Sequence, residues 1–89
     1  MYQYKEQRAY IFTEKGQIEF LRIRDHVQDL LTRAGAVRMD CATHPPGRGS
    51  SDSWDAIACV DRLVELKELR EITPKDTIGQ HRIFVSTKL

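Results

Sequence analysis

The chain has 89 residues, which is the length of a single small domain with a thin core. Lys and Arg number 14 and Asp and Glu number 13, so the net charge of +1 excludes a histone-like basic protein and an acidic tail protein. With 40% hydrophobic and 30% charged residues, the composition is typical of a folded domain rather than a disordered chain.

The sequence shows no targeting or membrane signal. It contains no run of about 18 apolar residues, and the opening MYQYKEQR is polar, unlike the apolar region of a signal peptide. We therefore expect a cytoplasmic protein without a membrane partner, in which Cys41 and Cys59 are reduced thiols. Cys59 lies among apolar residues and is expected in the core.

The first predicted elements are a strand over residues 8–13, which is rich in β-forming residues, and a helix over residues 15–34. Thr13 is placed to cap the helix, and Gly35 is a typical residue just beyond a helix end. We expect the core to be built by apolar residues at helical and strand spacing, namely Ile18, Leu21, Leu31, Ile57, Val60, Val64 and Ile83.

The middle of the chain predicts a short strand, a loop and a second helix. Residues 37–41 alternate apolar and polar, whereas two prolines and two glycines over 44–51 exclude a helix there. Apolar residues spaced three and four apart then predict a helix over 53–68.

The last predicted elements are a strand over 69–73 and a return strand over 81–86, joined by a polar turn over 74–80. These two strands form a predicted β-hairpin. The expected fold is a small α+β domain with two main helices, a C-terminal β-hairpin and an N-terminal strand.

Two stretches carry a resemblance to a known superfamily. The run CVDRLVELKELREI at residues 59–72 resembles the third helix and first wing strand of winged helix-turn-helix domains, and the similarity extends over residues 53–86. The run YIFTEKG at residues 10–16 resembles a strand-to-helix junction that follows the wing in several winged-helix regulator families, although here it precedes the domain. The resemblance implies one winged-helix-like domain over residues 1–89 and a role in transcriptional control.

The sequence departs from that pattern where a winged helix-turn-helix has a short helix before the recognition helix. Residues 37–44 occupy that place, and their pattern leaves open whether they form a strand or a short helix. If the short helix is absent, a two-layer sandwich in which both helices cover one sheet is the alternative.

Catalytic and metal chemistry find little support in the sequence. Cys41 and His44 have ligand-like spacing, but only one such tight pair is present and zinc sites usually need two. Ser50, Ser51 and Ser53 are better explained as turn and cap residues than as nucleophiles. We expect no enzyme activity, no cofactor and no metal.

Binding of double-stranded DNA is the main functional expectation. In winged helices the start of the recognition helix enters the major groove and the wing contacts the backbone. The residues that the resemblance assigns to these roles are Arg48, Ser51, Ser53 and Trp54 at the helix start, and Lys75, His81 and Arg82 in the wing.

Protein interaction, with another protein or with a second copy of the chain, is the rival expectation. Residues 51–72 carry six acidic and three basic side chains, a net charge of −3 that would repel phosphates, whereas residues 73–89 carry +2. Trp54 either anchors its helix to the core or lies exposed as a binding residue. Binding to a second copy would also support a thin core.

Overall fold

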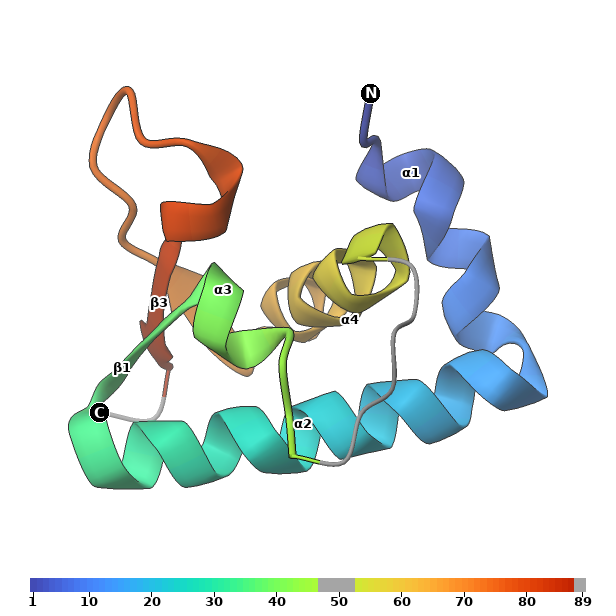
Figure 1. Cartoon of the computed structure of the whole chain (residues 1–89), viewed down its shortest axis with the longest axis horizontal. Coiled ribbons are helices and arrows are strands. Elements are labelled where there is room, and N and C mark those ends of the chain that lie inside the picture. The colour runs from blue at the N-terminus through green and yellow to red at the C-terminus, as the bar shows by residue number, and fades with distance from the viewer. Residues whose placement is uncertain (47–52, 88–89) are drawn as a thin grey trace.

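The computed structural model describes residues 1–46 and 53–87, and helix α2 is its longest element (Figure 1). The helices are α1 (Tyr4–Gln7), α2 (Glu14–Ala34), α3 (Met39–Ala42) and α4 (Ser53–Glu65), with 3-10 helices η1 (Arg8–Phe12) and η2 (Gly79–His81). The strands are β1 (Ala36–Arg38), β2 (Leu69–Glu71) and β3 (Ile83–Ser86). The described residues thus form a small α+β domain.

Helix α2 confirms the predicted helix and both of its ends. The Thr13 hydroxyl accepts a hydrogen bond of 3.0 Å from the backbone N–H of Gly16, and Gly35 ends the helix in the left-handed conformation with φ of 79°. The buried face differs from the predicted one, because it contains Phe20, Ile23 and Val27. The expectation that Ile18 and Leu21 are core residues is wrong, since both are more than half exposed.

The predicted strand over residues 8–13 is also wrong, because residues 8–12 form η1. This segment lies between α2 and α4, so its backbone groups are satisfied locally, and both the N–H and the hydroxyl of Thr13 donate to the Tyr10 carbonyl. The β-forming side chains serve packing, since Ile11 is completely buried. A preference for strand reflects fit to a pleated surface, and the helices offer a different surface here.

The sheet is antiparallel with the strand order β1-β3-β2. β2 pairs with β3, which confirms the predicted hairpin with shorter strands, and β1 pairs with the other edge of β3 so that Val37 lies opposite Phe84. Pairing of β1 ends at Arg38, and Met39 starts α3 by donating its N–H to the Arg82 carbonyl at 2.8 Å. Residues 37–41 therefore contain both the end of a strand and the beginning of a short helix.

Helix α4 ends three residues earlier than the predicted boundary at 68. The N–H groups of Lys67 and Glu68 donate to the carbonyls of Val64 and Leu63, at 3.0 and 2.9 Å. This pair of bonds closes the helix, and Lys67 adopts the required left-handed conformation with φ of 63° although it is not glycine. The chain then enters β2 directly.

The core lies where α2, α4, η1 and the sheet meet (Figure 1). Its largest completely buried side chains include Phe84 from the middle strand, Ile11 from η1 and Leu63 from α4. Cys59 is buried there, as predicted, and neither cysteine is bonded to the other. In the described part of the chain, no helix has the length and apolarity needed to cross a membrane.

Candidate functional site

The structure describes five of the seven residues predicted to contact nucleic acid. Arg48 and Ser51 lie outside the described residues, and Ser53 is the first residue of α4. Lys75 and His81 are exposed in the connection between β2 and β3. Arg82, the third predicted wing residue, is directed toward α4.

Arg82 is held by two carboxylates. Its Nη2 atom lies 2.8 Å from Asp61 of α4 and 2.8 Å from Glu71 of β2, and its Nε donates to the second Glu71 oxygen at 2.9 Å. These bonds, with those to Glu71 first, raise the pKa of the guanidinium above its ordinary value. The side chain is largely buried, so Arg82 would have to leave both carboxylates in order to contact a phosphate.

The N-terminal segment, residues 2–8, covers the acidic face of α4. Figure 1 shows α1 beside α4. Four polar side chains of the N-terminal segment form hydrogen bonds with α4. Tyr2 donates to Asp61 at 2.6 Å, Tyr4 to Glu65 at 2.7 Å, Gln7 to Asp55 at 2.5 Å and Arg8 to Glu65 at 2.9 Å.

Glu65 is the centre of these contacts. Its carboxylate accepts hydrogen bonds from Tyr4, Arg8 and Arg62, and these bonds lower its pKa to about 2. Burial and the bond to Glu65 raise the pKa of Tyr4 to about 12. Both groups therefore keep their paired protonation states across the whole neutral range.

Helix α4 consequently has little free surface. Of its residues 54–65, only Trp54 and Glu65 are exposed. A helix that reads base edges needs a row of exposed polar side chains along its groove-facing side. Residues 54–65 of α4 do not present such a row while the N-terminal segment is in place.

Trp54 is exposed and also packs against another side chain of the same chain. The indole is 40% exposed, yet one ring contact joins it to Tyr2, with centroids 6.2 Å apart and planes at 71°. This edge-to-face contact adds an aromatic link between the N-terminal segment and the start of α4. Trp54 thus helps to fix the segment that covers its own helix.

Among the described residues, no three His, Cys, Asp or Glu side chains lie together as the ligands of a metal ion would. Cys41 and His44, whose spacing resembles that of metal ligands, have different surroundings. Cys41 is an exposed free thiol, whereas the His44 Nδ1 atom lies 2.7 Å from the Asp40 carbonyl and stabilises the end of α3.

A different surface emerges on the outer side of α2. Ile18 is 58% exposed and Leu21 is 51% exposed, and both lie opposite the buried face that contains Phe20. Helical geometry could have predicted this exposure, because Ile18 is rotated by about 160° around the helix axis from the buried Phe20. The sequence interpretation missed it because it centred the buried face on Ile18 and Leu21.

Four charged residues surround these two apolar side chains: Glu14, Lys15, Arg22 and Asp25. All four are exposed, and the described part of the chain gives none of them an ion pair or a side-chain hydrogen bond. We call Ile18 and Leu21 with these four residues the outer face of α2. It is an apolar pair with free charges of both signs at its edges.

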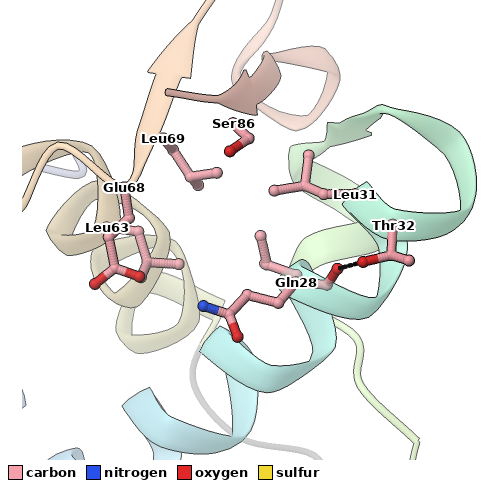
Figure 2. Close-up of a pocket in the computed structure, with 8 residues that line it drawn as sticks. Gln28, Leu31, Thr32, Leu63, Glu68, Leu69 and Ser86 are labelled. Atoms are coloured by element: carbon pink, nitrogen blue, oxygen red, sulfur yellow. Dashed lines mark hydrogen bonds between the residues drawn. The ribbon is translucent and has the colours of Figure 1, made fainter. Parts of the chain in front are cut away.

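A cavity of about 430 Å³ opens between α2, α4 and the sheet. Figure 2 shows the residues that line it, namely Gln28, Leu31 and Thr32 of α2, Leu63 of α4, and Leu69 and Ser86 of the strands. Glu68 at its rim is paired with Arg24 at 2.9 Å. The cavity therefore combines an apolar floor with a rim of neutral or already paired polar groups.

Comparison of the chain with protein-family models, curated proteins and solved structures found no match.

Proposed function

We propose that this chain is a protein-interaction module with a winged-helix-like fold, and that it binds its partner through the outer face of α2. The observation that carries this proposal is the exposure of Ile18 and Leu21 amid unpaired charges. Exposed apolar residues ringed by polar ones are typical of protein contact sites, in which a small apolar centre supplies most of the binding energy.

The winged-helix-like part of the proposal is supported by the order of the elements. A short helix, α3, lies before α4 at the place where that fold has its second helix, and α4 is followed by the β2–β3 hairpin. The acidic face of α4 is occupied by the chain's own N-terminal segment. Ile18 and Leu21 are therefore two exposed apolar side chains on α2, a helix that the N-terminal segment does not cover in this way.

Site-specific photocrosslinking tests this function. A photoreactive amino acid replaces Ile18, and the same group at exposed Gln80 in the hairpin connection is the matched control. In cells that make the protein, we expect a discrete product from position 18 that is absent from position 80 and is lost when Leu21→Arg is added. The absence of any product specific to position 18 would contradict the proposal.

The second candidate is duplex DNA binding, which the exposed Lys75 and His81 of the hairpin connection favour. Under this candidate, affinity falls steeply as salt rises, and Lys75→Glu weakens binding to every duplex sequence alike. Asp76→Asn, which removes a neighbouring negative charge, is the control and is expected to bind more tightly. No measurable binding at low salt removes this candidate.

A further inference from the structure

We infer that the acidic face of α4, made by Asp55, Asp61 and Glu65, is a second binding site, which takes a basic, tyrosine-containing segment of a partner protein in place of this chain's own residues 2–8. The chain's own segment is then an internal competitor that keeps the site closed. This inference goes beyond the proposed function and is independent of it, because it concerns α4 and not the outer face of α2.

The first step is the charge on the two sides of the contact. Residues 2–8 carry two basic side chains and one acidic, a net charge of +1, whereas α4 carries three acidic and one basic, a net charge of −2. The segment supplies hydroxyl, amide and guanidinium donors to the three carboxylates of α4. The acidic face therefore favours a segment that is rich in hydrogen-bond donors and positive in charge.

The second step is the apolar floor beside these carboxylates. Ala58 lies between Trp54 and Asp61 at helical spacings of four and three, so all three are on one side of α4. Ala58 is completely buried, and the rings of Tyr2 and Tyr4 are partly buried against the core. A tyrosine fits such a site, because its ring covers the apolar floor while its hydroxyl reaches a carboxylate at the edge.

The third step is the attachment of the segment to the rest of the chain. The structure describes α1 in full, and none of its four residues is buried. The bonds of Tyr4 and Arg8 to Glu65 are exposed to solvent, where such contacts contribute little. The chain is anchored beyond this point, where α1 gives way to 3-10 geometry and the completely buried Ile11 follows. Residues 2–8 can therefore leave α4 while Ile11 stays in the core.

The test supplies the chemistry of the segment on a separate molecule. The probe is the nonapeptide AYAYAAQRA, which keeps the side chains and the spacing of Tyr2, Tyr4, Gln7 and Arg8. The control peptide AFAFAAQQA keeps the aromatic rings but removes both hydroxyls and the guanidinium group. Binding of each fluorescein-labelled peptide is measured by fluorescence anisotropy at low salt, with protein concentrations that reach the millimolar range.

All of the proteins tested are the full chain. Tyr2→Ala with Tyr4→Ala is the open variant, because it removes two of the donors and the ring that contacts Trp54. Two further proteins add Glu65→Lys, which reverses the charge of an acceptor, or Asp76→Lys, which makes the same change at an exposed position of the hairpin connection. Circular dichroism and urea unfolding show whether each protein is folded.

We expect the open variant to bind the probe at least about tenfold more tightly than the wild type, in which the chain's own segment competes at high effective concentration. Glu65→Lys should weaken binding to the open variant about tenfold and Asp76→Lys less than about threefold. The control peptide should bind about tenfold more weakly than the probe.

Four results would each overturn the inference. They are an open variant that binds no better than the wild type, binding that survives Glu65→Lys, an equal loss with Asp76→Lys, and equal binding of the control peptide. An open variant that does not fold would also overturn it, because residues 2–8 would then be part of the core instead of a covering segment.

Discussion

Gly16 marks the closest approach of α2 to the segment that precedes it. A Cβ atom at this position would lie 2.9 Å from the Ile11 Cα atom and would overlap the Tyr10 carbonyl oxygen. These are backbone atoms, which cannot move aside without shifting η1 and the buried Ile11 side chain. Glycine normally weakens a helix, but here its missing side chain lets α2 start directly against η1.

Gly16→Ala is therefore expected to destabilise the domain by about 2–4 kcal/mol, although alanine is the better helix former. Gly79→Ala is the control, because nothing lies within 4 Å of a Cβ atom there, and its effect should stay below about 0.5 kcal/mol. The measurement is the free energy of unfolding in urea. Equal or higher stability of Gly16→Ala would show that η1 does not lie against α2 in this way.

Among the elements, the two main helices were predictable because local signals determine them. Thr13 and Gly35 are adjacent to α2 in the sequence, and the apolar spacing of α4 needs no distant partner. Segment 8–12 was not predictable, because its helical turns depend on packing between α2 and α4. The partners of Arg82 were equally hidden, since Asp61 lies 21 residues away in the sequence.

The N-terminal segment and α4 are joined through Glu65, which makes their association dependent on pH. The folded-state pKa of Glu65 is about 2, below its ordinary value of 4.5, so its stabilising effect is complete above about pH 4.5 and is lost as pH falls toward 2. We expect Glu65→Gln to lower the free energy of unfolding by about 1 kcal/mol near neutral pH, a value limited by solvent screening.

The same comparison near pH 2 should show little difference between Glu65→Gln and the wild type, because the wild-type carboxylate is then largely protonated. Glu6→Gln, which removes an exposed carboxylate from the N-terminal segment, is the control for the change in net charge. Urea unfolding is measured for all three proteins at both pH values. A deficit of Glu65→Gln that persists unchanged in acid would contradict the carboxylate's role.

For the molecule as a whole, the net charge of +1 conceals opposite charges that meet inside the fold. The acidic stretch over 51–72 and the basic stretch over 73–89 contact each other where Arg82 joins Asp61 and Glu71. These charged side chains therefore pair with one another within the chain instead of remaining free for an outside partner. The free charges flanking Ile18 and Leu21 on α2 are consequently better placed for recognition than Arg82.

Because the molecule is small, its free energy of unfolding is small, and this limits which core substitutions it can tolerate. A domain of this length has a total stability of about 4–13 kcal/mol. Phe84 is completely buried in the middle strand of the sheet, between β1 and β2, so Phe84→Ala is expected to cost about 3–5 kcal/mol.

Phe12 is 53% exposed, with its ring beneath the guanidinium groups of Arg8 and Arg62. Phe12→Ala should cost only about 1 kcal/mol, because it removes mainly these two contacts. Thermal unfolding followed by circular dichroism compares the two variants, and the same chemical change makes each the control for the other. If Phe12→Ala proved as damaging as Phe84→Ala, the stability would depend on η1 and its arginines as much as on the sheet, and β3 would not be the centre of the core.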